Sequence, residues 1–338
     1  MKAAIFDKPG GVENLVVREV EDPVCGEDQV IVDVRFAALN HLDLWVRKSS
    51  AYATKLPHVG GSDGAGVISK IGSKVNNFSL GDRVLINPGV SCGDCRYCNM
   101  GEQSNCDKFY IMGSGSWGTE AEKVAIKAEN LLKIPDNISL EDAAAAPLTY
   151  ITVYRMLATK ANVQPGETVL VTGAGGGVGS VAIQMAKVMK ARVIALTSTD
   201  KLEMVKKLKP DILIDYKVQP QWHEIVIENG GADVIIESVG EKTWGNSIKS
   251  LNKRGRLVTI GATTGSLGQT EIRDLYRKQA SIHGSYMGSN EEFKKSMVYL
   301  FDGSVKPIID SIHSLSRVRE AHERLESGKH FGKVLIKP

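Results

Sequence analysis

Four closely spaced cysteines have the clearest chemistry in this chain. Their pattern is Cys92-x2-Cys95-x2-Cys98-x7-Cys106. Four thiolates at this spacing can surround a Zn²⁺ ion as a tetrahedron, and a site with four protein ligands leaves no open position for water. The pattern therefore predicts one structural zinc. The fifth cysteine, Cys25, stands alone, and an odd number of cysteines does not favour a disulfide framework.

A glycine-rich stretch predicts a phosphate-binding turn. It follows the apolar run Val169–Val171 and precedes apolar residues at helical spacing up to Met189. A strand, a glycine turn and a helix N-terminus direct free N–H groups at an anion, and the missing Cβ atoms let a pyrophosphate come close. A plain glycine turn is the alternative. We expect the cofactor to contact Gly173, Gly175, Gly176, Gly177, Val178 and Gly179.

The end of the next apolar strand bears on which dinucleotide binds. NAD-selective folds place an acidic side chain here, about 20 residues past the glycines. This chain has Leu196–Thr199, followed by Asp200 and Lys201. A carboxylate would repel a 2′-phosphate, whereas Ser198 and Lys201 would bind one, so the sequence favours NADP(H). Two alternatives stay open, because Ser198 and Thr199 can cap the following helix and Asp200 can reach a ribose.

Two kinds of elements must position these motifs. Residues 1–90 are rich in short strands separated by Pro- and Gly-bearing loops, and after residue 150 strands alternate with helices. The first group comprises Lys2–Phe6, Leu15–Glu19, Gln29–Ala38, Ala65–Ile71 and Asp82–Ile86. The second comprises Val169–Val171, Val193–Leu196, Ile212–Ile214, Val234–Glu237, Leu257–Ile260 and Ser281–Ser285. The pattern predicts an α/β fold in which a β-rich module joins a doubly wound parallel six-stranded sheet.

Length and composition limit the possible functions. The 338 residues suggest two domains, and a net charge of +3 is too small and too evenly spread to indicate nucleic-acid or membrane partners. The N-terminus lacks the apolar core of a signal peptide, and no apolar run approaches the length of a membrane span. We therefore expect a cytoplasmic protein that acts on a small-molecule substrate.

Taken together, these motifs resemble the medium-chain dehydrogenase/reductase superfamily, to which the zinc-containing alcohol dehydrogenases belong. The resemblance includes Gly60–Gly66, Gly81–Val84 and the closing Gly332–Leu335, and it covers essentially the whole chain. It implies a GroES-like catalytic domain at residues 1–124 and 288–338, with a structural zinc lobe at 91–107. It also implies a Rossmann NADP(H)-binding domain at 125–287.

The chain departs from the zinc alcohol dehydrogenases where their catalytic zinc is held. The first ligand, a Cys, aligns with Asn40, and the His ligand aligns with Ser62, although Asp63 keeps the acidic neighbour. The third ligand position falls at Leu148 or Thr149, and the proton-relaying hydroxyl aligns with Leu42. An amide, a hydroxyl and an alkyl chain do not make a zinc site. A site improvised from His41, His58 and Asp63 is the alternative.

The chain instead resembles the quinone oxidoreductase and enoyl reductase branch, which carries Asn and Asp at the positions of Asn40 and Asp43. The resemblance implies that Asn40 steadies an enolate or the nicotinamide amide and that Asp43 orients it. It also places Trp45 and Tyr52 at the substrate pocket, and Tyr52 can donate a hydrogen bond or proton. Thr152, Tyr216 and Gly261 complete the expected cofactor contacts.

The leading hypothesis is therefore an NADPH-dependent reductase of quinones or of α,β-unsaturated carbonyl and enoyl compounds, a class that includes acyl-CoA thioesters. An alcohol dehydrogenase with a non-standard metal site and a catalytically silent NADPH-binding protein are the alternatives. Because the last sheet strand, Ser281–Ser285, would be an exposed edge in a monomer, we expect a homodimer or homotetramer.

Overall fold

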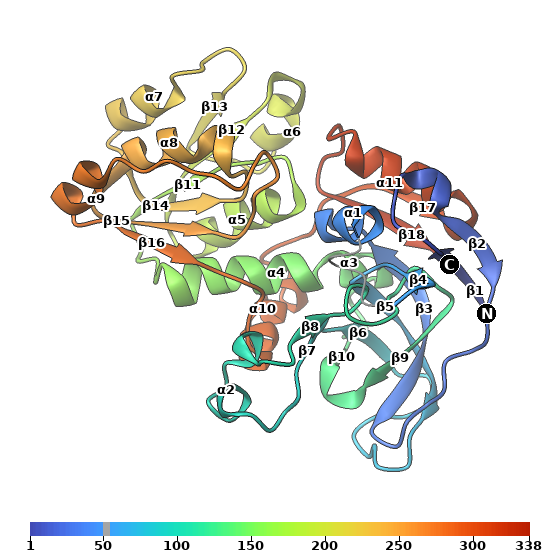
Figure 1. Ribbon diagram of the computed structural model, residues 1–338. Helices are drawn as coiled ribbons and strands as arrows, with labels where there is room; N and C mark the ends of the chain where they lie inside the picture. The colour runs from blue at the N-terminus through green and yellow to red at the C-terminus, as the bar shows by residue number, and fades with distance from the viewer. Residues whose placement is uncertain (50–54) are drawn as a thin grey trace. The chain divides into compact units, whose positions relative to one another are not determined.

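The computed structural model describes residues 1–49 and 55–338, which divide into two units (Figure 1). Unit 1 contains Met1–Leu148, Gly288–Phe301 and Pro307–Pro338, and unit 2 contains Thr149–Met287 and Asp302–Lys306. The sequence had placed residues 125–148 with the Rossmann domain. They lie in unit 1 because β9 (Lys123–Lys127) and β10 (Leu131–Lys133) pair with strands of that unit.

Unit 1 is built on a seven-stranded sheet with the order β10-β6-β5-β3-β18-β17, in which β9 also pairs with β3. A three-stranded sheet, β2-β1-β4, and a two-stranded sheet, β7-β8, complete the unit. The remaining strands of the unit are β1 (Lys2–Phe6), β2 (Val16–Glu19), β3 (Gln29–Ala38), β4 (His58–Val59), β5 (Asp63–Ile71), β6 (Arg83–Ile86), β7 (Gly89–Val90), β8 (Tyr110–Ile111), β17 (Ile309–Ser314) and β18 (Lys333–Lys337).

The last strand, β18, lies between β3 and the edge strand β17. In β18, Leu335 lies opposite Ala38 and Ile336 lies opposite Ala37 on β3. Apolar side chains of both strands are buried in one core that also includes residues of α11 (Val318–Glu326). This antiparallel pairing brings the start of β18 close to the segment that follows β3.

Unit 2 contains a parallel sheet with the order β13-β12-β11-β14-β15-β16, which confirms the predicted doubly wound six-stranded sheet. Its strands are β11 (Thr168–Val171), β12 (Arg192–Thr197), β13 (Ile212–Asp215), β14 (Ala232–Glu237), β15 (Leu251–Thr259) and β16 (Ser281–Gly284). The order reverses between β11 and β14, and ligands of such sheets bind beyond the carboxyl ends of the strands at this point. The glycine-rich turn follows β11 directly.

Helices pack against both sheets (Figure 1). Those of unit 1, besides α11, are α1 (His41–Lys48), α2 (Arg96–Asn99), α3 (Leu140–Ala145) and α10 (Asn290–Phe301). Those of unit 2 are α5 (Gly177–Val188), α6 (Leu202–Lys206), α7 (Trp222–Glu228), α8 (Glu241–Ser250) and α9 (Ile272–Lys278). Helix α4 (Pro147–Tyr154) begins in unit 1 and continues as a π-helical turn, Arg155–Lys160, in unit 2. The sequence predicted no helix at α1.

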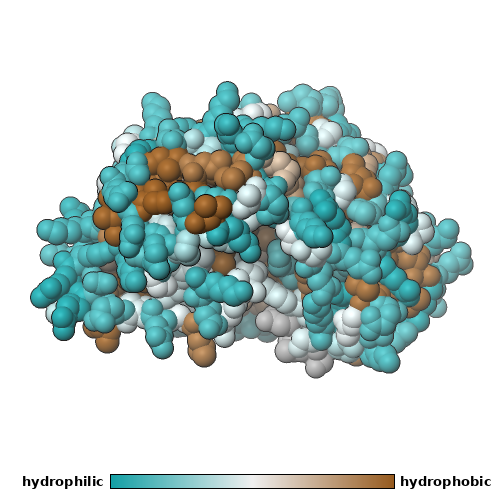
Figure 2. All heavy atoms as spheres, turned by 90° about the horizontal axis from the view of Figure 1, so that it is seen from above, coloured by the Kyte–Doolittle hydropathy of each residue, from teal (hydrophilic) through white to brown (hydrophobic). Residues whose placement is uncertain are grey.

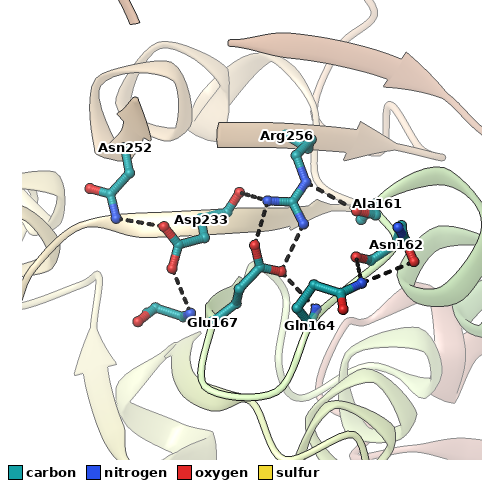
Figure 3. Close-up of polar contacts among 8 residues, drawn as sticks. Ala161, Asn162, Gln164, Glu167, Asp233, Asn252 and Arg256 are labelled. Carbon is teal, nitrogen blue, oxygen red and sulfur yellow. Dashed lines mark hydrogen bonds and ion pairs between the residues drawn. The ribbon is translucent and has the colours of Figure 1, made fainter. Parts of the chain in front are cut away.

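A polar network fixes the loop that leads into β11 (Figure 3). The Arg256 guanidinium on β15 donates to both carboxylate oxygens of Glu167, over 2.8 and 2.7 Å, and to the Ala161 carbonyl over 3.0 Å. Asp233 on β14 accepts from the Thr168 amide over 2.8 Å. The bonds from Arg256 hold the pKa of Glu167 below its usual value. The network ties the start of β11 to the strands beyond it.

The face of the molecule drawn in Figure 2 is mostly polar. Figure 2 shows charged and polar residues over most of the face seen from above, with a brown band of hydrophobic residues among them. None of the helices in the described parts of the chain combines the length and the hydrophobicity needed to cross a membrane.

Candidate functional site

The four cysteines of the lobe converge as the spacing predicted. Their sulfur atoms all lie within 4.8 Å of one another. The Cys95–Cys98, Cys92–Cys106 and Cys92–Cys98 sulfur pairs are 3.6, 3.4 and 3.9 Å apart. Ligands about 2.3 Å from a tetrahedral zinc lie roughly 3.8 Å apart, so the thiols fit this ion.

Backbone amides near the lobe also favour thiolate sulfur. The amides of Cys92 and Lys108 donate to the Cys106 sulfur over 3.5 and 3.3 Å. Donation from the Cys98 amide lowers the pKa of Cys95 to about 7, which brings this thiol close to ionising at neutral pH. A thiolate is the form that binds zinc. Short helix α2 and the following turn position three of the four ligands, Cys95, Cys98 and Cys106.

The glycine-rich turn has the geometry of a phosphate site. Gly173 has φ +62°, in the left-handed region, and a Cβ on Gly179 would lie 2.3 Å from the Gly173 carbonyl oxygen. These two glycines therefore allow the tight turn and bring α5 close to it. Helix α5 begins at Gly177, and its N-cap residue, Gly176, makes no side-chain hydrogen bond to the first amides. The turn leaves these N–H groups available to a pyrophosphate.

Cationic side chains lie near the end of β12. In dinucleotide-binding folds the residues at this strand end contact the ribose that distinguishes NADP(H) from NAD(H). The Lys201 side chain lies against the turn, because a Cβ on Gly175 would be 2.4 Å from Lys201 Cδ. The Ser198 hydroxyl bonds to Asp200 and, with Lys201 and Lys217 nearby, holds the pKa of Asp200 below its usual value. The carboxylate of Asp200 is thus ionised, but two cations lie near it.

Lys217 was not singled out in the sequence. Its ammonium lies 5.7 Å from the centre of the half-exposed Tyr216 ring, which the resemblance had placed in the cofactor pocket. The signal was a basic residue directly after that tyrosine. Thr199 donates to Asp215 over 2.6 Å, so it is engaged at the end of β13.

In unit 1, Asn40 lies in a buried polar cluster that we call the Asn40 cluster: Asn40, Ser62, Asp63 and Lys333. Asn40 follows β3 and is the N-cap residue of α1, and Asp63 is the first residue of β5. The Asn40 amide nitrogen donates to Ser62 Oγ over 3.0 Å and to Asp63 Oδ2 over 2.9 Å. Its two N–H bonds are therefore both engaged.

Lys333, at the start of β18, completes this cluster. Its ammonium donates to Asn40 Oδ1 over 2.6 Å and to Asp63 Oδ2 over 2.9 Å. Asp63 is fully buried and Lys333 is only 4% exposed. The other oxygen of Asp63 accepts from the Leu148 backbone amide over 2.8 Å. The sequence had identified Lys333 only as part of the closing family motif, because nothing local relates it to Asn40.

Two further buried acids lie next to the cluster. Asp43 accepts from the backbone amides of Asn40, over 2.6 Å, and Gly61, over 3.3 Å. Glu120 contacts His322 Nε2, at 3.2 Å from each of its oxygens. Burial, and then the charge of Glu120, raise the pKa of Asp43 to about 7, although the bond from Asn40 opposes the rise. Asp43 thus binds the backbone amide of the residue that caps α1.

Comparison with known proteins agrees with this architecture. Residues 26–136 match the family described as "Alcohol dehydrogenase GroES-like domain", and residues 177–302 match "Zinc-binding dehydrogenase". The chain is 31% identical to an alcohol dehydrogenase of Schizosaccharomyces pombe, over 99% of this chain and 97% of that protein. It is 33% identical to an acryloyl-coenzyme A reductase of Metallosphaera sedula, over 99% of both chains. The chain belongs to the medium-chain dehydrogenase/reductase superfamily.

Solved structures of this superfamily share the fold throughout. An NAD-dependent alcohol dehydrogenase is 38% identical and superposes with a TM-score of 0.96 over the whole of both chains. The thermostable alcohol dehydrogenase of Pyrobaculum aerophilum, solved with cobalt and zinc bound, is 32% identical with a TM-score of 0.92, over 100% of this chain and 99% of that one. Membership confirms the family and fold that the sequence indicated, and it places this chain among oxidoreductases.

As a member of this superfamily, the chain can be tested for residues that fit a catalytic zinc. The aligned positions are Asn40, whose amide is fully engaged, Ser62, a hydroxyl, and Leu148 or Thr149. A metal bound by Asn40 Oδ1 would share that oxygen with the Lys333 ammonium. Two unit charges 4 Å apart repel by about 4 kcal/mol at an effective dielectric constant of 20, and a dication doubles this. These residues do not fit a catalytic zinc.

The improvised alternative is also not supported. In the described ranges, the four cysteines are the only group of three or more His, Cys, Asp or Glu residues with ligand atoms near enough to share a metal. His58 Nε2 contacts the Gly113 carbonyl at 2.9 Å, and the exposed His41 lies beside His330, with ring centres 6.0 Å apart.

The remaining predicted residues fall in several places. Trp45 lies half-buried in α1, and Thr152 is buried in α4. Gly261 lies after β15, where a Cβ would be 2.7 Å from the Ser238 carbonyl oxygen. Tyr52 lies outside the described residues.

Proposed function

We propose that this protein is an NADPH-dependent reductase of quinones or α,β-unsaturated carbonyl compounds that works without a catalytic zinc. The observation that carries the proposal is the Asn40 cluster, in which an amide and a hydroxyl stand at two of the aligned ligand positions and the Lys333 ammonium donates to the oxygen of that amide. Reductases of conjugated C=C bonds need no Lewis acid of zinc strength, because the developing charge spreads over an enolate that hydrogen-bond donors can stabilise.

The reaction balances with the cofactor and one proton. Bound NADPH supplies a hydride to the β-carbon of the conjugated C=C bond. The π electrons of that bond form a new double bond between the α-carbon and the carbonyl carbon, and the carbonyl π electrons move to oxygen. The α-carbon of the resulting enolate then takes a proton from solvent. The substrate gains two electrons and two hydrogens, and NADP⁺ is the other product. The residues of this chain bind the substrate and stabilise the charge on its oxygen.

Within this proposal Asn40 has a positioning role. Its two N–H bonds go to Ser62 and Asp63 and its oxygen accepts from Lys333, so the amide orders its neighbours and does not itself donate to an enolate. Asp43 in turn fixes the backbone amide of Asn40. Trp45 and Tyr52 are proposed to line the substrate pocket, as in related reductases.

The proposed preference for NADPH rests on charge at the end of β12. The positive charges of Lys201 and Lys217 act on Asp200, whose carboxylate is hydrogen-bonded to Ser198. A lost charge-assisted bond costs about 1.5–3 kcal/mol, so NADPH should bind roughly ten- to a hundredfold more tightly than NADH. Lys201→Ala should narrow this gap in fluorescence titrations. Equal affinity of the unmutated protein for both cofactors would defeat the assignment.

Alcohol dehydrogenase is the second candidate, because several relatives carry that name. One experiment separates the two. The purified protein, with its zinc counted by elemental analysis, is assayed with NADPH against enones, quinones and enoyl-CoA thioesters, and with NADP⁺ and NAD⁺ against primary and secondary alcohols. Acyl thioesters are included because acryloyl-CoA reductases are among the relatives. We expect reduction at one zinc per chain and negligible alcohol oxidation. If alcohol oxidation increases with added Zn²⁺ and the active protein holds two zincs per chain, the protein is an alcohol dehydrogenase and the reductase proposal is wrong.

A further inference from the structure

The fold holds Lys333 rigidly where it meets Asn40. Its backbone amide donates to the Ile308 carbonyl over 2.8 Å, and the β18–β3 pairing begins two residues later. Gly332, just before it, has φ +88°, and a Cβ there would lie 2.3 Å from the Ile308 oxygen. Only glycine fits this position, so the chain enters β18 by a path that directs Lys333 into the interior.

The Lys333 ammonium has one N–H bond more than its contacts use. An ammonium has three donors, and two of them go to Asn40 Oδ1 and Asp63 Oδ2. Among the residues that the structure describes, no other acceptor contacts it. Ser62 also has an unused hydrogen-bond donor. Its oxygen accepts from Asn40, and its hydroxyl hydrogen has no acceptor among the described residues.

These two spare donors are held at opposite ends of one amide. Lys333 binds the oxygen of Asn40, and Ser62 binds its nitrogen. Both side chains are almost completely buried, and a buried donor acts on a developing charge with little screening by water. Each of these two groups can therefore donate one further hydrogen bond to an oxygen on which negative charge develops.

We propose that Lys333 is a catalytic residue whose free N–H bond, assisted by the Ser62 hydroxyl, receives the carbonyl oxygen of the substrate. This rests on the proposed function. As the hydride reaches the β-carbon and the π electrons move to oxygen, the ammonium stabilises the negative charge there. Lys333 keeps its proton, and the proton that completes the product at the α-carbon comes from solvent. The lysine supplies the positive charge that zinc supplies elsewhere in the superfamily.

The Asp63 carboxylate has two opposite effects on the Lys333 ammonium. It partly offsets the lysine charge, yet without it the ammonium would be buried unpaired. The other partner of Lys333 is a neutral amide oxygen and not a second carboxylate, so the remaining N–H bond keeps the character of a charged donor.

The test compares Lys333→Met and Lys333→Arg with Lys337→Met, which removes an exposed lysine from the same strand. The substrate is whichever carbonyl acceptor the unmutated protein reduces fastest. Removing one oxyanion donor typically lowers kcat a hundred- to a thousandfold. We expect this for Lys333→Met, with a smaller loss for Lys333→Arg and none for Lys337→Met. Zinc content and NADPH affinity should not change.

Chemical rescue distinguishes a catalytic from a structural lysine. Lys333→Ala leaves room for a small primary alkylammonium ion, and a series of such amines should restore turnover to an extent that depends on the amine pKa. A kcat of Lys333→Met within about threefold of the unmutated value, or rescue equal for all amines, would overturn the role of Lys333 and leave the reductase proposal standing. If Lys333→Met and Lys333→Ala lose zinc or NADPH binding, the decision rests on Lys333→Arg, whose unchanged kcat and pH profile would count against an ammonium-specific role. No reduction of any carbonyl acceptor by the unmutated protein would instead remove the reductase proposal, and this role with it.

Discussion

The buried carboxyl of Asp43 predicts an unusual dependence of stability on pH. Its pKa in the folded protein is raised to about 7, from an ordinary value near 3.8, mainly by burial and then by the charge of Glu120. A raised pKa means that the folded state holds the proton more tightly than the unfolded state. The resulting stabilisation is complete below about pH 4 and is lost as the pH rises through 7.

The size of the effect follows from these two pKa values. Between pH 5 and pH 8 the contribution of Asp43 to the free energy of unfolding should fall by roughly 2 to 3 kcal/mol. In Asp43→Asn the side chain cannot ionise, so this part of the pH dependence should disappear. Titrating groups far from Asp43, including the cysteine thiols, affect both proteins alike. The difference between the two proteins therefore reports Asp43 together with Glu120 and His322, on which its charge acts.

Urea denaturation followed by tryptophan fluorescence, at pH 5, 6, 7 and 8 and constant ionic strength, measures this difference. The control is Asp310→Asn. Burial tends to raise the pKa of Asp310, but the bonds from Arg324, the Phe331 amide and Ser311 outweigh it and lower the pKa to about 2. Its stabilisation is present above about pH 4, so Asp310→Asn should shift all four points equally. The quantity compared is the free energy of unfolding of the unmutated protein minus that of Asp43→Asn, which we expect to fall as the pH rises. If this difference stays constant within about 0.5 kcal/mol from pH 5 to pH 8, or increases, the raised pKa of Asp43 is wrong.

Three further predictions concern other parts of the chain. Cys92→Ser should remove the single zinc, which elemental analysis counts, and lower the melting temperature; a variant that keeps one zinc per chain would show that the four thiols are not its site. Arg256→Met should lower the free energy of unfolding by about 2 kcal/mol, because Glu167 loses its bidentate partner, whereas Arg254→Met, at an exposed neighbour, should change it little in the same urea titration. Light scattering at micromolar concentration should give a dimer or tetramer, because β15 is the only strand of the described residues that pairs with β16, which lies at the edge of its sheet; a monomer would contradict this.

The parts that were predictable from sequence have local signals. Apolar runs fix β11 and β12, and the glycines between them mark the turn, whose geometry needs no information from elsewhere in the chain. The cysteine spacing is similarly self-contained, since 14 residues separate its first and last ligands. The start of α3 also has a local signal, because the hydroxyl of its N-cap residue, Ser139, accepts from the Asp142 amide over 3.0 Å.

The Asn40 cluster could not be assembled from the sequence, because its contacts are distant in the chain. Lys333 lies 293 residues from Asn40, and His322 lies 202 residues from Glu120. Only the pairing of β18 with β3 brings Lys333 close to Asn40. The sequence pattern of a strand does not reveal which other strands it pairs with in the sheet. Helix α1 was missed for a different reason. Its eight residues follow an extended strand directly and are too few to show a clear apolar period.

The charges of the Asn40 cluster explain why its residues belong together. Asp63 is fully buried, and an unpaired carboxylate there would be strongly destabilising, so some cation must stand beside it. A metal could compensate the charge only with ligands that residues 40 and 62 do not offer. Lys333 compensates it with two hydrogen bonds, and its charge then disfavours a dication at the same oxygen. The amide, the hydroxyl and the ammonium are therefore one electrostatic arrangement, in which the cation needed to stabilise Asp63 is also the group placed to polarise a substrate carbonyl.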